Sequence, residues 1–99
     1  MELTEIRNEI DKIDDELKVL YFRRMNLSKE VAKYKAATEN GRIASVYKPD
    51  RERQIIERLT ADIEGEDEVL KEDYIMFIKR VLQNSRNYQE ILLTGDELL

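Results

Sequence analysis

The sequence of 99 residues contains no cysteine and no histidine. Without cysteine, the chain can form no disulfide bond, thiolate nucleophile or zinc–thiolate site. Without histidine, it lacks the commonest general base and the commonest metal ligand. Carboxylates alone could still bind a metal ion, but no loop has the alternating oxygen ligands of an EF-hand. We therefore expect a protein that uses no metal and no other cofactor.

Long apolar runs are also absent. The longest, residues 19–22, is far too short to span a membrane, and the N-terminal residues lack the apolar core of a signal peptide. The net charge of −5 argues against binding to nucleic acid. These features predict a soluble, cytoplasmic protein that binds neither membranes nor nucleic acid.

Glycine and proline are scarce, with three glycines and one proline in the chain. Leucine, isoleucine, glutamate, lysine and arginine dominate, and no segment shows the sustained alternation of a strand. We expect one all-α domain, residues 1–99, with one long, one short and one medium helix at about residues 4–38, 49–64 and 71–93. Asn40-Gly41 and Gly95 are helix-ending signals, and residues 65–68 read as a polar connector.

An apolar residue recurs at every third or fourth position of the first predicted helix. This apolar stripe consists of Leu3, Ile6, Ile10, Ile13, Leu17, Leu20, Leu27, Val31 and Tyr34, and Arg24 interrupts it. At 1.5 Å per residue the helix is roughly 50 Å long, whereas a compact domain of this size has a radius of gyration of only about 13 Å. Because one chain cannot cover the whole stripe, we expect a homodimer.

Polar residues interrupt the apolar faces of all three predicted helices. Arg24 lies in the first helix, Glu52 in the second, and Ser85 and Gln89 in the third. A single polar residue in such a face often fixes register or oligomeric state. Four of them on three helices favour a shared polar pocket, because buried polar groups need hydrogen-bond partners.

A second column of residues, spaced by seven, runs beside the apolar stripe. It consists of Arg7, Asp14, Tyr21, Ser28 and Lys35. These residues flank the same groove, although Arg7 and Lys35 could equally be solvated. Arg7 lies about 25 Å from Arg24 along the helix, so one small ligand cannot reach both within one chain. If two long helices pair antiparallel about Leu17, however, the partner's Arg7 comes alongside Arg24 and Lys35.

The pocket of such a dimer would combine residues of both chains. It would hold Arg24, Lys35, Glu52, Ser85 and Gln89 from one chain and Arg7 from its partner. Arginine recognises carboxylates through paired hydrogen bonds, so two separated arginines predict a small dicarboxylate ligand. Because the pocket offers no nucleophile and no obvious proton shuttle, an enzyme built on it would act by positioning and electrostatic stabilisation.

The order and spacing of residues 6–14, 23–24, 31–35 and 46–53, with Ser85 and Gln89, resemble those of the all-helical (AroQ-class) chorismate mutases. The resemblance covers residues 3–93. It implies an intertwined helical homodimer with two active sites. It also implies that the chain converts chorismate to prephenate by an intramolecular Claisen rearrangement, without a cofactor, in the biosynthesis of phenylalanine and tyrosine.

The resemblance also implies roles for individual residues. Arg24 and the partner's Arg7 bind the two carboxylates of chorismate. Lys35 and Gln89 donate hydrogen bonds to the ether oxygen, where negative charge builds as the C–O bond breaks. Glu52 binds the ring hydroxyl.

Three further residues are implied to line the site. Arg51 and Ser85 complete its wall. Lys48 stands where the family often has aspartate, which is a better helix N-cap than lysine. The side-chain role of that aspartate is lost here, although the backbone N–H of Lys48 could still meet the substrate hydroxyl.

Two other functions fit the same sequence features. One is an isochorismate-pyruvate lyase on the same scaffold, because a dicarboxylate pocket would serve both reactions. The other is a non-catalytic helical dimerisation or regulatory module. That module would pair Arg24 with a protein carboxylate such as Glu52 and would bind no ligand.

Overall fold

The computed structural model describes residues 1–38 and 46–94, which contain three α-helices and one short 3-10 helix. The elements are α1 (Leu3–Thr38), α2 (Pro49–Thr60), the 3-10 helix η2 (Gly65–Leu70) and α3 (Lys71–Thr94). The described ranges contain no strand, so the predicted all-α class with one long, one short and one medium helix is confirmed. The predicted helix ends at Asn40-Gly41 and Gly95 lie outside the described residues.

The connection between α2 and α3 differs from the sequence prediction. Helix α2 ends at Thr60 rather than near residue 64, and residues 65–70 form η2 rather than a plain connector. The Thr60 hydroxyl donates to the Ile56 carbonyl at 2.7 Å, a local bond that competes with regular helix geometry. Gly65, the first residue of η2, has a φ of 65°, a left-handed conformation that suits glycine.

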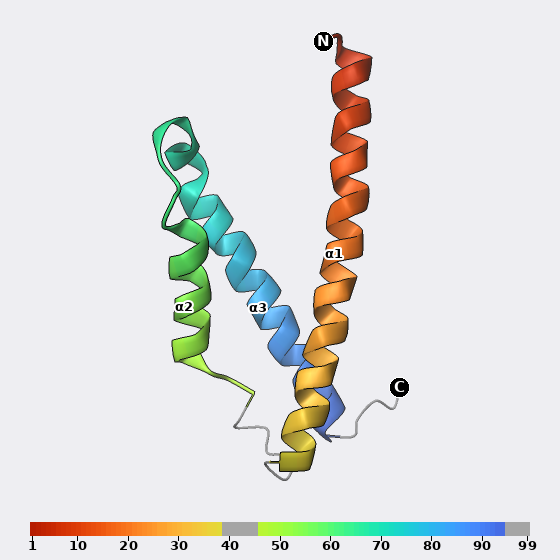
Figure 1. Cartoon of the computed structure of the whole chain (residues 1–99), viewed down its shortest axis with the longest axis vertical. Helices are drawn as coiled ribbons and strands as arrows, with labels where there is room; N and C mark the ends of the chain where they lie inside the picture. Colours follow the sequence, from red (N-terminus) through yellow and green to blue (C-terminus); the bar gives the residue numbers. More distant parts are fainter. Residues whose placement is uncertain (39–45, 95–99) are drawn as a thin grey trace.

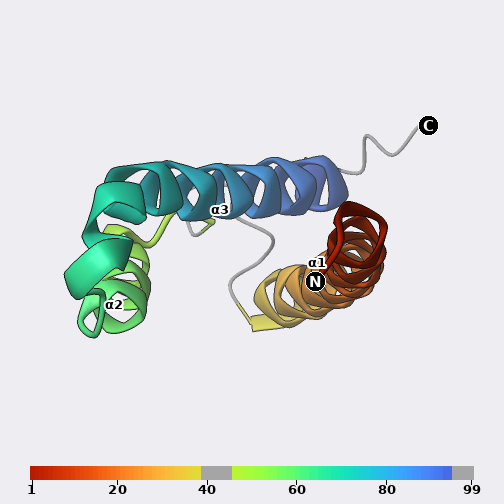
Figure 2. The same ribbon diagram turned by 90° about the horizontal axis from the view of Figure 1, so that it is seen from above.

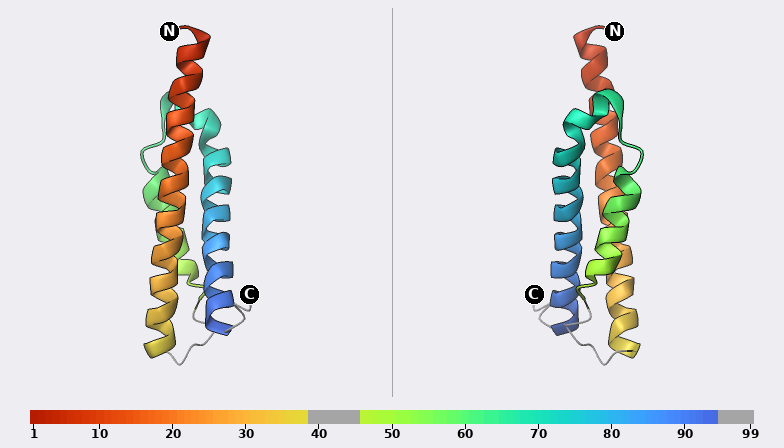
Figure 3. Two further views of the ribbon diagram at one scale, coloured as in Figure 1. Left: turned by 90° about the vertical axis from the view of Figure 1, so that its right-hand side faces the viewer. Right: turned by 90° about the vertical axis from the view of Figure 1, so that its left-hand side faces the viewer.

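Helix α3 lies between α1 and α2 and contacts both (Figures 1 and 2). The C-terminal half of α3 packs against the C-terminal half of α1, while the N-terminal half of α1 stands clear of the other helices. Figure 3 shows the thin profile of the chain, with the N-terminal end of α1 extending beyond η2. The arrangement is therefore an open helical layer, which measures 55 × 29 × 16 Å.

The single chain buries little apolar surface. Within the described ranges, its buried apolar residues are Ala32, Val46, Ile55 and Leu82. Residues 1–20 are all exposed, and so are the nine apolar residues of the stripe. The radius of gyration is 17.1 Å, against about 13 Å for a compact domain of this length. An exposed apolar surface of this extent marks an interaction site.

The contact between α1 and α3 uses the second column of α1 rather than the apolar stripe. Ser28 is buried, and its hydroxyl lies 2.6 Å from the hydroxyl of Ser85. The Asn84 amide donates to the Tyr21 hydroxyl at 3.1 Å. Tyr21 and Ser28 therefore face α3, whereas the side chains of the apolar stripe remain exposed.

Candidate active site

A pocket of about 360 Å³ lies where the C-terminal halves of α1 and α3 meet the start of α2. Seven of the eight site residues predicted from the sequence line it: Arg24, Lys35, Lys48, Arg51, Glu52, Ser85 and Gln89. The remaining lining residues are Leu27, Ser28, Val31, Val46, Ile55, Leu82 and Arg86. The volume falls within the range of pockets that bind small molecules.

Helical spacing brings these residues together. On α1, Arg24, Ser28, Val31 and Lys35 follow at intervals of three and four residues, so they share one face. The same spacing places Leu82, Ser85 and Gln89 on the facing side of α3, and Lys48, Arg51, Glu52 and Ile55 at the start of α2. Polar residues that interrupt three apolar faces thus meet in one place.

A chain of hydrogen bonds ties Gln89 to α1. The Gln89 amide donates to the Ser85 hydroxyl at 3.2 Å, Ser85 and Ser28 share a bond of 2.6 Å, and the Ser28 hydroxyl donates to the Arg24 carbonyl at 3.2 Å. With Ser28 donating to the carbonyl, Ser85 donates to Ser28. This wall of the pocket is therefore fixed by bonds between two helices.

The side-chain oxygen of Gln89 is buried and has no hydrogen-bond partner within the described residues. Buried polar atoms in folded proteins are nearly always paired, so this atom needs an explanation. A half-turn of the amide exchanges its oxygen and nitrogen, so the position can offer a ligand either an acceptor or an N–H donor. Gln89 therefore has unused hydrogen-bonding capacity in the pocket wall.

The pocket is strongly cationic although the chain is acidic overall. Five cationic side chains and one carboxylate line it, which gives a formal charge of +4, whereas the whole chain carries −5. Lys35 is 9 % exposed, so its charge is held largely out of water. Concentrated positive charge in a partly enclosed pocket attracts small anions.

Arg24 and Glu52 do not pair with each other. Arg24 forms no ion pair with a carboxylate in the described part of the chain. Glu52 pairs instead with Arg86 on α3, whose Nη1 lies 2.5 Å from both carboxylate oxygens. The Arg24–Glu52 pairing that the non-catalytic interpretation predicts is therefore not formed.

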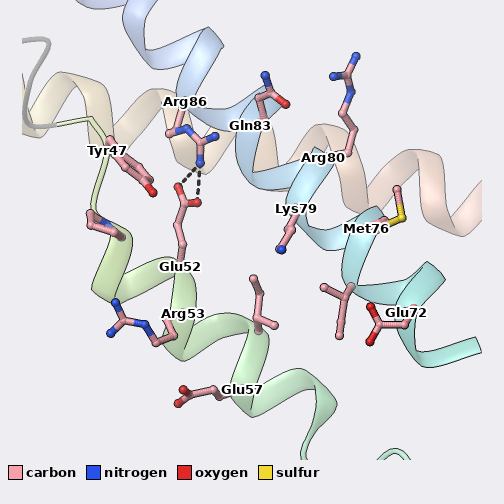
Figure 4. Close-up of a pocket in the computed structure, with 13 residues that line it drawn as sticks. Tyr47, Glu52, Arg53, Glu57, Glu72, Met76, Lys79, Arg80, Gln83 and Arg86 are labelled. Carbon is pink, nitrogen blue, oxygen red and sulfur yellow. Dashed lines mark hydrogen bonds and ion pairs between the residues drawn. The ribbon is translucent and has the colours of Figure 1, made fainter. Parts of the chain in front are cut away.

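Arg86 is a pocket residue that the sequence interpretation missed. Its guanidinium lies 4.9 Å from the centre of the Tyr47 ring, in addition to its bonds to Glu52 (Figure 4). A charged residue at a helix edge usually points to solvent, and Arg86 is therefore not among the predicted site residues. Its position four residues after Leu82 and three before Gln89 was the available signal, because such neighbours share a helix face.

A second, larger groove of about 1000 Å³ lies between α2 and α3. It shares Glu52 and Arg86 with the pocket (Figure 4) and includes the apolar residues Ile56, Ile75 and Met76. The Glu52–Arg86 pair therefore lies at the boundary between the pocket and this groove.

Arg7 is the one predicted site residue that the single chain does not bring to the pocket. It is exposed on the N-terminal half of α1, about 25 Å along the helix from Arg24. In this chain alone, the pocket thus has no contribution from Arg7.

The described ranges contain neither a cluster of metal ligands nor a helix that could span a membrane. There, no three acidic side chains lie close enough together to hold a metal ion. No described helix combines the length and the apolar composition that a membrane span requires.

Comparison with known proteins gives one match. The family model described as chorismate mutase type II matches residues 6–90. This range is most of the chain and contains all eight predicted site residues. No curated protein and no solved structure gives a significant match.

Proposed function

This chain belongs to the chorismate mutase type II family, and we propose that it acts as a homodimer whose two active sites each combine residues of both chains. The enzyme is an isomerase that rearranges chorismate to prephenate. The observation that best supports the shared site is the pocket at the junction of α1, α2 and α3, which holds Arg24, Lys35, Glu52, Ser85 and Gln89 but lacks Arg7.

The exposed apolar stripe supports the homodimer. A second copy of α1, paired antiparallel with a two-fold axis near Leu17, would cover the stripe with an identical stripe. In that pairing the partner's Arg7 lies about level with Leu27, which lines the pocket. Each pocket would then receive the partner's Arg7, and each dimer would hold two sites.

The two carboxylates of chorismate are bound by Arg24 and the partner's Arg7 in this proposal. Arg24 forms no ion pair with a carboxylate of the described chain, so its guanidinium is available to the ligand. Planar guanidinium groups bind carboxylates through two parallel hydrogen bonds, which also fix the orientation of the substrate. Holding both carboxylates selects the compact conformation in which the reacting carbons meet.

The rearrangement breaks one C–O bond and forms one C–C bond within a single molecule, so no group leaves and no proton must be transferred. Negative charge develops on the ether oxygen as the C–O bond breaks. Lys35 and Gln89 are both buried and donate hydrogen bonds to that oxygen in our proposal. Preorganised donors in a water-poor pocket stabilise such charge more strongly than water does.

The remaining pocket residues hold the rest of the substrate. Glu52 accepts a hydrogen bond from the ring hydroxyl. Lys48, Arg51 and Ser85 complete the wall, and the backbone N–H of Lys48 is a second candidate for the hydroxyl. No residue in this scheme forms a covalent bond to the substrate.

We further propose that the enzyme works in the cytoplasm, in the biosynthesis of phenylalanine and tyrosine. Chorismate and prephenate are small dianions that do not cross a membrane unaided, so the enzyme belongs to the compartment where its substrate is made. The product has the carbon skeleton from which these amino acids derive.

Purified protein should consume chorismate and form prephenate, because the pocket offers two carboxylate anchors and donors for the ether oxygen. The loss of chorismate absorbance gives the rate, and product analysis identifies prephenate. The same preparation should form no salicylate or pyruvate from isochorismate. Salicylate and pyruvate from isochorismate, with no turnover of millimolar chorismate, would establish a lyase instead.

A further inference from the structure

The first turn of α2 carries three proposed site residues, Lys48, Arg51 and Glu52, but has no side-chain cap. Lys48 occupies the N-cap position and makes no capping hydrogen bond. The first backbone bond of the helix runs from the Glu52 N–H to the Lys48 carbonyl at 3.1 Å. An uncapped helix start is held weakly by local bonds, so other contacts must fix its position against α3.

Arg86 of α3 supplies such contacts, because it touches Tyr47, which precedes Lys48 in the sequence, and Glu52, which follows it. Its Nη1 donates to both oxygens of Glu52 at 2.5 Å, and its guanidinium lies over the Tyr47 ring (Figure 4). The Arg86 and Glu52 side chains are 26 % and 20 % exposed. The Arg86–Glu52 pair is therefore partly buried and joins two helices, whereas the Arg53–Asp50 pair is exposed and links neighbours within α2.

We propose that Arg86 is a positioning residue, which fixes the first turn of α2 to α3 and aims the Glu52 carboxylate at the substrate. The inference rests on the proposed role of Glu52 in binding the ring hydroxyl. Each carboxylate oxygen can accept two hydrogen bonds, so the bonds from Arg86 leave room for the substrate hydroxyl. Arg86 thus orients Glu52 without occupying its whole accepting capacity.

The geometry also predicts which features of Arg86 matter. Its Nη1 bonds to Glu52 while its planar guanidinium lies over the Tyr47 ring. Lysine keeps the charge and can reach the carboxylate, but it lacks the planar guanidinium group that lies over Tyr47. Arg86→Lys should therefore restore part of the activity that Arg86→Met loses.

A double-mutant cycle on kcat/KM for chorismate tests the proposal. Arg86→Met alone should lower kcat/KM by about 10- to 100-fold, the scale of a misplaced catalytic group. In a Glu52→Ala background the same substitution should cost less than about threefold, because coupled residues are not additive. Arg53→Met, which removes the exposed pair with Asp50, is the matched control and should stay within about twofold of wild type.

Folding is checked for every variant by circular dichroism and by the mass in solution. If Arg86→Met does not fold, the cycle is run with Arg86→Lys. Equal losses from the Arg86 substitution in both backgrounds would overturn the proposal, because Arg86 would then act independently of Glu52. Full activity of folded Arg86→Met with a loss in Glu52→Ala would overturn the positioning role alone. Full activity of Glu52→Ala would overturn the proposed role of Glu52 as well.

Discussion

Gln89→Ala should lower kcat for chorismate by about 100- to 1000-fold, the usual cost of removing one donor to a developing oxyanion. Gln89 is buried in the pocket wall and held by the Ser85 hydroxyl. Its amide has hydrogen-bonding capacity that the described chain does not use. Lys35→Ala should give a loss of similar size. The rate of chorismate consumption at saturating substrate measures kcat.

Gln89→Ala should have little effect on the free energy of unfolding. The buried Gln89 oxygen has no hydrogen-bond partner among residues 1–38 and 46–94, and an unpaired buried acceptor costs roughly 1–3 kcal/mol. Truncation removes this unfavourable atom together with one bond to Ser85, so we expect a change below about 2 kcal/mol in urea unfolding. A normal kcat, or a loss of activity that only follows unfolding, would contradict the assigned role.

Asn84→Ala is the matched control for Gln89→Ala. Asn84 is also an amide on α3, and it donates to the Tyr21 hydroxyl of α1 at 3.1 Å, but it does not line the pocket. Its loss should cost about 1 kcal/mol of stability and change kcat by less than about twofold, because it makes no contact with the substrate.

Gln89→Glu separates hydrogen-bond donation from packing at the same position. Glutamine does not titrate, so kcat of the wild-type enzyme should be flat across neutral pH. A glutamate at this position donates a hydrogen bond only when it is protonated. The variant should therefore lose activity as the pH rises, and a flat profile for the variant would argue against a donor role.

Leu17→Glu should abolish the dimer and reduce activity by at least about 100-fold, although position 17 touches no substrate. Leu17 is half exposed in the single chain, and glutamate is a good helix former, so α1 should persist. At a two-fold axis the substitution would place two carboxylates against each other, and each pocket would lose the partner's Arg7. Mass in solution and kcat/KM measure the two effects.

Lys18→Glu provides the control for this substitution. It introduces the same side chain at the next position of α1, which is exposed and lies off the apolar stripe. Dimer mass and activity should stay close to those of the wild type. A fully active Leu17→Glu monomer would refute the link between the dimer and the active site.

The sequence predicted the three helices and most of the pocket because both depend on residue spacing. Apolar residues at intervals of three and four predict the helices, and polar residues that interrupt those faces predict the shared pocket. Arg24, Glu52, Ser85 and Gln89 were found in this way, and they line one cavity. Pairwise spacing within helices thus contains most of the information that positions the site.

Features that depend on contacts between helices could not be predicted in this way. The bond between Ser28 and Ser85 and the bond between Asn84 and Tyr21 place Ser28 and Tyr21 of α1 against α3, and spacing within a single helix does not show such contacts. Arg86 looks like any exposed arginine until Glu52 lies beside it.

The end of α2 and the presence of η2 escaped prediction for a local reason. The left-handed backbone of Gly65 is a conformation that glycine permits but does not require. The pattern of apolar residues continues to Ile63, so it extends the predicted helix beyond Thr60. The regular helix nevertheless stops at Thr60, and the Ile63 N–H bonds to the Thr60 carbonyl at 3.2 Å, three residues back instead of four.

Mixing two inactive variants tests most directly whether each active site is shared between two chains. Arg7→Ala and Gln89→Ala are purified separately, unfolded together in equal amounts and refolded, so that mixed dimers form. In a mixed dimer, one pocket has its own Gln89 and an intact Arg7 from the partner, while the other pocket has neither. Random pairing should therefore restore about one quarter of wild-type activity. No recovery from a mixture that has formed mixed dimers would contradict the shared site, because Arg7 and Gln89 would then have to come from the same chain.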